Sequence, residues 1–239
     1  ASLPMYDWPE ERANVDAQWV KIREALRASG LDAPDHLTRQ DDLHGVWADP
    51  NLVLGQTCGL PFSLGLHEKT NLIGTFNYHL DETPPGFYRS VVVVRAGDPR
   101  SVGECFADVI AVNSQDSQSG WGALANWAKG YGNIHWGTLV ISGSHRRSAA
   151  LVANGQASLA ALDLVSFLLV QRHAPDIAAA LKVVVTTSAT PALPLICAPR
   201  FDPDRIGSAI EAALGPDALI RHSPSAYLSV PQTPFPLET

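Results

Sequence analysis

The sequence lacks three features that would assign it to a class at once: a long apolar run, paired cysteines and an excess of positive charge. No stretch of about 18 apolar residues occurs, so we expect no membrane-spanning helix. The cysteines, Cys58, Cys105 and Cys197, are odd in number and widely spaced, which argues against a disulfide framework and a CxxC metal site. With 17 basic and 24 acidic residues, the net charge is −7, which argues against a nucleic-acid partner.

Other absences narrow the function further. The P-loop, GxGxxG, HExxH and GxSxG patterns are missing, and the eight histidines lack metal-ligand spacing. We therefore predict no cofactor, no metal site and no catalytic residue. The start of the chain does not read as a signal peptide, so two compartments stay open: the periplasm, if the protein is exported, and the cytoplasm.

What the sequence does contain is an alternation of short apolar runs with helical patterns, which is typical of an α/β fold with parallel strands. Apolar residues make up 46% of the chain, enough for a substantial core. The proline-rich tail from residue 223 is expected to be extended over the surface. Strands are predicted at 1–5, 51–55, 71–74, 88–97, 105–112, 138–141, 158–162 and 181–186, and helices at 15–26, 120–129, 145–153, 164–172 and 204–214.

Two Val-rich strands, at 88–97 and 181–186, lack the alternation of a half-buried strand and bracket a block of about 90 residues. A lobe that is inserted between two such strands is the construction of a hinged two-lobe clamp. We predict two lobes, each a mostly parallel sheet flanked by helices. Lobe 1 is discontinuous, from residues 1–95 with 187–239, and lobe 2 is the inserted block at residues 96–186.

Ligands of open α/β sheets bind at the carboxyl ends of strands, near helix N-termini. The segment 116–121 has this position, because it follows one predicted strand and opens a predicted helix. The hydroxyls of Ser117 and Ser119, together with the free amides of the first helical turn, favour an anion such as a phosphate, phosphonate or carboxylate. The alternative is that Asp116 or Ser117 only caps the helix.

Polar residues at other predicted strand ends are further candidates. Ser144 and His145 repeat the arrangement of strand end, polar turn and helix start, and His145 either bonds a ligand or is structural. Asp163 either pairs with a ligand cation or caps the helix that follows it. The equivalent positions in the first lobe are Tyr6, Asp7, Gln56 and Thr57.

A binder of cationic or zwitterionic solutes is the first alternative to an anion binder. Trp8 and Trp121 could supply aromatic walls, and Asp163 or Asp7 a negative charge, which together would cage a quaternary amine. Binding assays with phosphonates and with quaternary amines separate the two hypotheses.

An enzyme on the same fold is the second alternative. Cys58 lies in a polar turn at a strand end and is the one plausible nucleophile, although a buried, inert cysteine is the more frequent case. A relay can be drawn from Ser117 or Ser119 with His145 and Asp163, but the nucleophile elbow that would accompany it is absent.

The chain resembles the PhnD-like substrate-binding proteins of phosphate, phosphite and phosphonate ABC transporters over nearly its whole length. The most specific likeness is segment 116–121, which is similar to the turn of small hydroxyl residues that holds phosphoryl oxygens in that family. Segments 142–145 and 88–94 resemble other stretches of the same family. The chain departs from the family pattern at Gln118, where a hydroxyl residue is usual, and at Arg146.

The resemblance implies a type II periplasmic-binding-protein fold that binds a solute and is not an enzyme. It implies a monomer that closes two lobes on a small anionic solute, such as a phosphonate or phosphate, and presents it to an ABC permease. By the same resemblance, the turn formed by Ser117, Gln118 and Ser119, here called the serine turn, binds the anionic head of the ligand. The predicted ligand-binding residues are Tyr6, Asp7, Gln56, Thr57, Asp116, Ser117, Gln118, Ser119, Gly120, Trp121, Ser144, His145 and Asp163.

Overall fold

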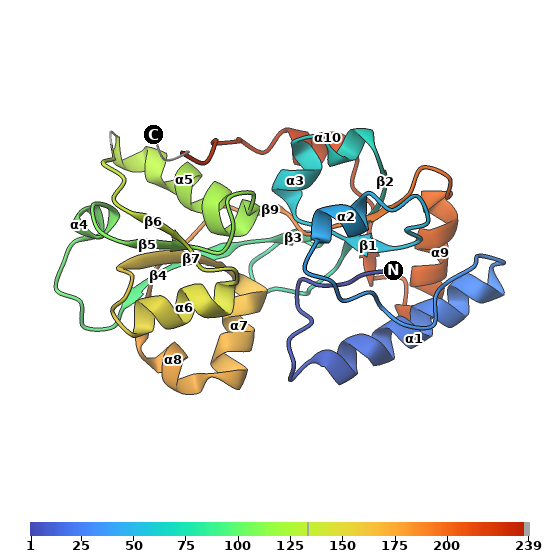
Figure 1. Ribbon diagram of the computed structural model, residues 1–239, viewed down its shortest axis with the longest axis horizontal. Coiled ribbons are helices and arrows are strands. Elements are labelled where there is room, and N and C mark those ends of the chain that lie inside the picture. The colour runs from blue at the N-terminus through green and yellow to red at the C-terminus, as the bar shows by residue number, and fades with distance from the viewer. Residues whose placement is uncertain (133, 237–239) are drawn as a thin grey trace. The chain divides into compact units, whose positions relative to one another are not determined.

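The computed structural model describes residues 1–132 and 134–236 (Figure 1). The chain forms two compact units: unit 1 comprises residues 1–87 and 191–229, and unit 2 comprises residues 88–190 and the tail from residue 230. The predicted division at residues 95 and 187 differs from this grouping. The strand near residue 90 belongs to unit 2 because it pairs there with strands on both of its sides.

Unit 1 contains a four-stranded sheet in which all three ladders are antiparallel. The mostly parallel sheet expected for this unit was therefore wrong. The reason is that β10, which returns after unit 2, lies between β1 and β2 and runs against both, so β1 and β2 still share one direction. In place of a strand at 1–5 there is a single parallel bridge from Ser2 to Gly55. The sheet order is β1 (Gly55–Gln56), β10 (Pro194–Cys197), β2 (Asn71–Phe76) and β11 (Leu219–Ile220).

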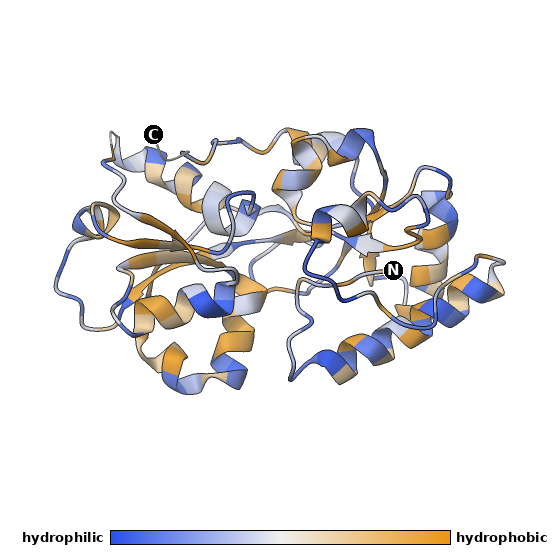
Figure 2. Cartoon of the chain, viewed as in Figure 1, coloured by the Kyte–Doolittle hydropathy of each residue, from blue (hydrophilic) through white to orange (hydrophobic). Residues whose placement is uncertain are grey.

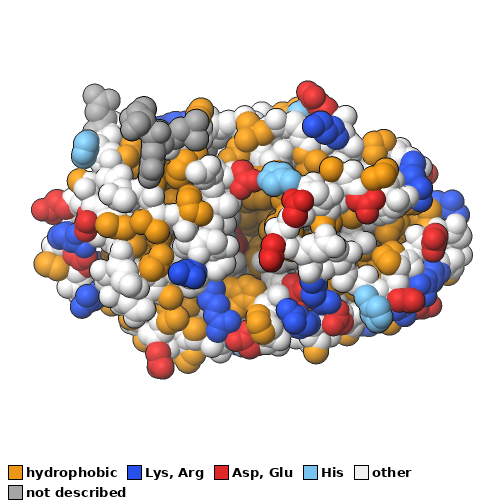
Figure 3. Space-filling view, in the orientation of Figure 1, with side chains coloured by type: hydrophobic (Ala, Val, Ile, Leu, Met, Phe, Trp, Pro, Cys, Tyr) orange, Lys and Arg blue, Asp and Glu red, His pale blue; other side chains and the backbone are white. Residues whose placement is uncertain are grey.

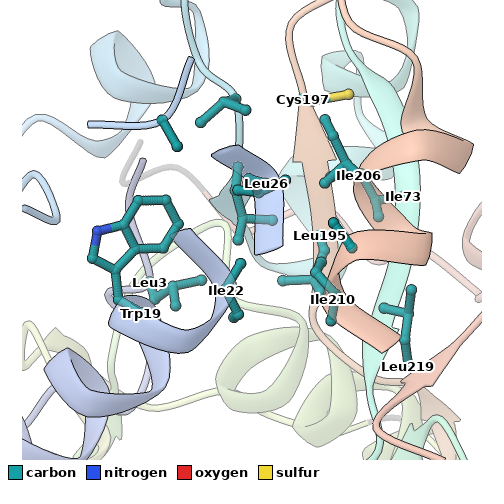
Figure 4. Packing of buried hydrophobic residues seen from close by; sticks show 14 of the residues in the cluster. Leu3, Trp19, Ile22, Leu26, Ile73, Leu195, Cys197, Ile206, Ile210 and Leu219 are labelled. Atoms are coloured by element: carbon teal, nitrogen blue, oxygen red, sulfur yellow. The ribbon is translucent and has the colours of Figure 1, made fainter. Parts of the chain in front are cut away.

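Two long helices, α1 (Arg12–Ala28) and α9 (Pro203–Leu214), pack against each other and complete the core of unit 1. Trp19, Ile22 and Leu26 recur at helical spacing on one face of α1 and belong to the same buried cluster as the apolar residues of α9 (Figure 4). Figure 2 shows the matching alternation of polar and apolar positions along α1. The shorter helices of this unit are α2 (Leu43–Trp47), α3 (Gly59–Ser63), η1 (Leu66–Glu68) and α10 (Pro224–Leu228).

Unit 2 contains a five-stranded sheet in which β6, β5 and β7 are parallel and β4 is antiparallel to both of its neighbours. β4 is buried along five of its six residues, as its unbroken run of valines predicted. β8 contains three consecutive valines but lies at the sheet edge and is partly exposed. The sheet order is β6 (Leu139–Ile141), β5 (Ile110–Val112), β7 (Leu159–Asp163), β4 (Ser90–Arg95) and β8 (Leu181–Thr186).

The helices of unit 2 follow the strands that lead to the candidate site. The predicted helices at 145–153 and 164–172 are confirmed within one residue at each end. The strand expected at 105–112 is confirmed only for its last three residues. Ser101 and Glu104 form a capping box that starts a short helix before it. The helices are α4 (Val102–Phe106), η2 (Gln118–Gly122), α5 (Ala123–Ala128), η3 (Lys129–Tyr131), α6 (His145–Ala153), α7 (Leu164–His173) and α8 (Pro175–Ala179).

The segments that pass between the units include two short strands, β3 (Phe87–Tyr88) and β9 (Thr190–Pro191), which pair with each other. The C-terminal tail, expected to be extended throughout, first forms α10, because Pro224 suits the first turn of a helix. None of the helices in the described ranges has the length and apolar character needed to cross a membrane. On the face drawn in Figure 3, basic and acidic side chains are interspersed, so this face has no single basic patch.

The pairing of Val93 with Val183 across β4 and β8 provides a matched test of the packing. Val93 is 0% exposed, whereas Val183 is 39% exposed. We expect Val93→Ala to lower the free energy of unfolding by about 2 kcal/mol, because buried methyl groups are lost and a cavity remains. Val183→Ala should lower it by less than about 1 kcal/mol. Urea unfolding measures both values, and equal losses would contradict the burial of β4 between β7 and β8.

Candidate functional site

The segment after β5 forms a buried turn that leads into a helix. Ser117 caps this helix, because its Oγ accepts a hydrogen bond from the Gly120 amide at 2.9 Å. Its carbonyl oxygen accepts hydrogen bonds from the amides of Trp121, at 3.0 Å, and Gly122, at 2.9 Å. The first turn, η2, is a π-helix, a conformation that is frequent at functional sites. The capping role considered for Ser117 is therefore confirmed.

Gly120 is required in this turn by a close approach of side chains. A Cβ atom at this position would lie 1.8 Å from Oδ1 of Asn113 and 3.1 Å from Oγ of Ser117. The Asn113 carbonyl also accepts a hydrogen bond from the Gly143 amide at 3.0 Å. The turn after β5 and the turn after β6 are therefore fixed to each other through Asn113.

Three polar side chains meet where the three parallel strands end. Oγ of Ser119 lies 2.8 Å from Nε2 of His145, and Oδ2 of Asp163 lies 3.4 Å from the same nitrogen. Ser119 follows β5, His145 is the first residue of α6 after β6, and Asp163 ends β7. Because parallel strands bring their carboxyl ends to one edge of the sheet, the fold brings these predicted site residues together.

Asp163 has two roles in this cluster. Its Oδ1 accepts a hydrogen bond from the amide of Ser166 at 2.9 Å, which makes it the N-cap of α7. Its Oδ2 faces His145. The capping alternative considered for Asp163 is thus confirmed, and the same carboxylate also places a negative charge within the cluster.

The arrangement differs from a catalytic Ser–His–Asp relay. In a relay, the serine and the carboxylate contact opposite nitrogens of the imidazole ring. Here both Ser119 and Asp163 contact Nε2 of His145. The geometry therefore suits hydrogen bonding to a ligand better than activation of the serine hydroxyl.

The ionisation of His145 is set mainly by its burial. Burial lowers the pKa of His145, and this effect exceeds the opposite effects of the Asp163 charge and of a hydrogen bond to the Ala161 backbone. The imidazole is therefore neutral near pH 7. The cluster presents a hydroxyl, a neutral imidazole and one carboxylate.

Trp121 does not take the role that was considered for it in an aromatic cage. It is 1% exposed, its Nε1 donates to the Thr233 carbonyl at 2.7 Å, and its ring packs on Trp136 and Phe235. A ring that is buried in the core on these partners cannot wall a ligand cage. Of the two tryptophans considered as walls of an aromatic cage, Trp8 and Trp121, the second is therefore not available to a ligand.

The remaining predicted site residues of unit 2 differ in burial and in hydrogen-bond partners. Gln118 is buried in η2. The Asp116 carboxylate accepts a hydrogen bond from Oγ of Ser114 at 2.7 Å. Ser144 is exposed and caps α6 by accepting a hydrogen bond from the Arg147 amide at 3.2 Å.

Unit 1 has a pocket of its own, with a volume of about 390 Å³. Gln56 lies in its wall, donating to the Tyr78 hydroxyl at 2.8 Å and accepting from the Met5 amide at 3.3 Å. Tyr6 packs edge-on against Tyr78 with the ring centroids 5.4 Å apart. The pocket is lined by Leu3, Tyr6, Val15, Gln18, Gln56, Phe76, Asn77, Tyr78, His79, Leu214 and Ala218.

Of the predicted residues in unit 1, only Tyr6 and Gln56 line this pocket. Thr57 is fully buried, and the Asp7 carboxylate pairs with Arg39. Cys58 is half-buried and precedes α3. The sequence interpretation missed three lining residues that follow β2, although a polar run directly after a strand was the available signal; these are Asn77, Tyr78 and His79.

Within residues 1–132 and 134–236, no group of three or more His, Cys, Asp or Glu side chains could hold a metal ion.

The lowered pKa of His145 makes protein stability depend on pH. The unfolded chain protonates this side chain below about pH 6.5, whereas the folded protein keeps it neutral to lower pH. Its contribution to stability is therefore complete above that pH and is lost as the pH falls from there toward the lowered pKa. From about pH 7 to about pH 5, we expect the free energy of unfolding to fall more steeply in the wild type than in His145→Gln.

Urea unfolding at several pH values measures this difference. The exposed His135 of the same unit gives a matched control, and His135→Gln should keep the steep wild-type decrease. If His145→Gln also kept it, the burial argument would be refuted.

Several solved structures are similar to this chain. A binding protein of a phosphonate ABC transporter from Pseudomonas aeruginosa has 14% sequence identity and a TM-score of 0.61, over 84% of this chain and 68% of that chain. PhnD1 from Prochlorococcus marinus, in complex with methylphosphonate, has 16% identity and a TM-score of 0.59, over 86% and 79%. An ancestral arginine-binding protein bound to arginine has 13% identity and a TM-score of 0.57, over 82% and 80%.

These likenesses show the fold, which is that of the type II periplasmic binding proteins, and they confirm the predicted fold class. No curated relative is found by sequence comparison. A family model described as the periplasmic substrate-binding protein of a phosphonate ABC transporter matches residues 73–215, which is more than half of the chain. The chain therefore belongs to the family of periplasmic substrate-binding proteins of phosphonate ABC transporters.

Proposed function

We propose that this protein is the solute-binding component of an ABC uptake system and that it binds a small oxyanion, a phosphonate or phosphate, at the cluster of Ser119 and His145. The observation that carries the proposal is the 2.8 Å contact between Ser119 Oγ and His145 Nε2 at the start of a helix. A hydroxyl and an imidazole that share one hydrogen bond lie close enough to contact neighbouring oxygens of one tetrahedral anion.

The helix that begins at this turn supports binding of an anion. η2 runs directly into α5, so the helical segment extends over Gln118–Gly122 and Ala123–Ala128. The N-terminus of such a segment carries partial positive charge and amides that point along the helix axis. Because the turn is buried, these dipoles are screened by water less than they would be on the surface.

The carboxylate of Asp163 restricts which anions the site is expected to bind. A carboxylate next to an anion site repels a fully ionised anion but accepts a hydrogen bond from a ligand that retains a proton. Phosphate and alkylphosphonates retain one proton in part near neutral pH, whereas sulfate does not. The cluster is therefore expected to favour phosphonate or phosphate over sulfate.

The rest of the transport cycle belongs to the same proposal. The family consists of substrate-binding proteins that act with a permease. Closure of the two units on the solute, a monomeric state and a periplasmic location remain predictions for this chain. The complex of PhnD1 with methylphosphonate supports the choice of ligand class, since that protein shares the fold.

Ser119→Ala tests the site directly. Loss of the hydroxyl removes a donor to the bound anion, so we expect the dissociation constant for methylphosphonate to rise about tenfold or more. Isothermal titration calorimetry measures it. Ser101→Ala is the matched control, because it removes the capping hydroxyl of α4 in the same unit. This control should lower stability by about 1 kcal/mol and leave the affinity unchanged.

A thermal-shift comparison of methylphosphonate, phosphate, sulfate and arginine tests the ligand class. A ligand at a hundredfold excess over its dissociation constant stabilises the folded state by about 2.7 kcal/mol, which gives a clear shift. We expect shifts with methylphosphonate or phosphate and none with sulfate. A shift with arginine alone would refute the proposal and favour a binder of cationic or zwitterionic solutes.

A further inference from the structure

The C-terminal tail lies along the helix that begins with the serine turn (Figure 1). Asn126 on α5 donates through Nδ2 to the Pro231 carbonyl at 2.8 Å and accepts through Oδ1 from Oγ1 of Thr233 at 3.3 Å. Trp121 donates through Nε1 to the Thr233 carbonyl at 2.7 Å, and its ring contacts Phe235 at a centroid distance of 4.9 Å. Three hydrogen bonds and one aromatic contact therefore fasten the tail to this helix.

Trp121 depends on the tail for its hydrogen bond. Its indole is buried, and a buried N–H that loses its acceptor is destabilising. The Thr233 carbonyl is the acceptor that the tail supplies. The tail is thus part of what holds the Trp121 ring in place.

Trp121 in turn belongs to the turn that carries the ligand-binding serine. It lies two residues after Ser119 within η2, and its amide donates to the carbonyl of Ser117. A displacement of the Trp121 ring therefore moves the backbone of this π-helical turn. The contact from Ser119 to His145 is sensitive to such a movement, because hydrogen bonds weaken steeply with distance and angle.

The tail is also anchored in unit 1, shortly before it reaches Asn126. The Tyr227 hydroxyl donates to the Ala192 carbonyl at 2.9 Å, and the Tyr227 ring packs edge-on against Phe62 at 5.1 Å. Pro231 is four positions after Tyr227 along the chain.

We propose that residues 230–236 form a strap that positions the turn at residues 117–122, which carries Ser119. Phe235 and Asn126 are then positioning residues for ligand binding. The strap touches Trp121 and α5 rather than Ser119 or His145. The effect of the strap on ligand affinity rests on the proposed function. Its effect on the conformational order of residues 117–122 is independent of any ligand.

Amide hydrogen exchange of the protein without added ligand tests the strap by itself. Removing the Phe235 ring in Phe235→Ala should speed exchange at residues 117–122 about tenfold, because the aromatic contact no longer holds Trp121. Asn126→Asp is a second variant of nearly the same size, which loses the donor to Pro231 and should act in the same direction. Phe201→Ala in unit 1 is the control: it removes a ring that packs on the core there and should leave exchange at 117–122 unchanged.

Titration with methylphosphonate and with phosphate tests the consequence for binding. Phe235→Ala should raise the dissociation constant about fivefold to tenfold, and Phe235→Tyr should restore it. Phe201→Ala should lower the melting temperature without changing affinity, which separates positioning from general loss of stability.

The two readouts separate the two proposals. If amide hydrogen exchange at residues 117–122 kept its wild-type rate in both Phe235→Ala and Asn126→Asp, the strap proposal would be refuted. If the wild-type protein bound neither methylphosphonate nor phosphate, the proposed function would fail, and the exchange data would still decide the strap.

Discussion

The parallel alignment of β6, β5 and β7 is the constraint on which the site depends. It brings Ser119, His145 and Asp163 from three separate stretches of sequence to one edge of a sheet. Each of these residues lies at a helix start or caps one, so the same backbone geometry that stabilises the helices orients the polar groups. Because these residues begin or cap helices, they are held by the hydrogen bonds of the helix starts rather than carried by a mobile loop.

The antiparallel strand β4 completes this arrangement from the other side of β7. Its valines pair with both β7 and β8, and they fill the centre of the sheet. β4 pairs with β7 in one continuous register, from Ser90 opposite Asp163 to Val94 opposite Leu159. β7 therefore has one well-determined register, and the position of Asp163 at its end follows from it. The core of unit 2 thus contributes to the geometry of the site as well as to stability.

Sequence reasoning succeeded where the signal was local and failed where the partner was distant. The helix at His145–Ala153 and the buried strand at Ser90–Arg95 could be read from periodicity and composition. The antiparallel order in unit 1 could not, because it depends on β10, which enters the sheet after more than a hundred residues of intervening chain. The same holds for Trp121: its acceptor is 112 positions away, so nothing near it in the sequence distinguished a core residue from a wall of the ligand site.

The prolines of the tail illustrate how one sequence feature supports two structural outcomes. Pro231, Pro234 and Pro236 predict an extended segment, and the described residues beyond α10, up to residue 236, form no helix or strand. They also restrict the backbone of the undocked tail, so that less conformational entropy is lost when it docks. A few contacts to Asn126 and Trp121 are therefore enough to order it. A tail rich in glycine, which loses more backbone freedom on ordering, would need a larger interface to hold the same helix.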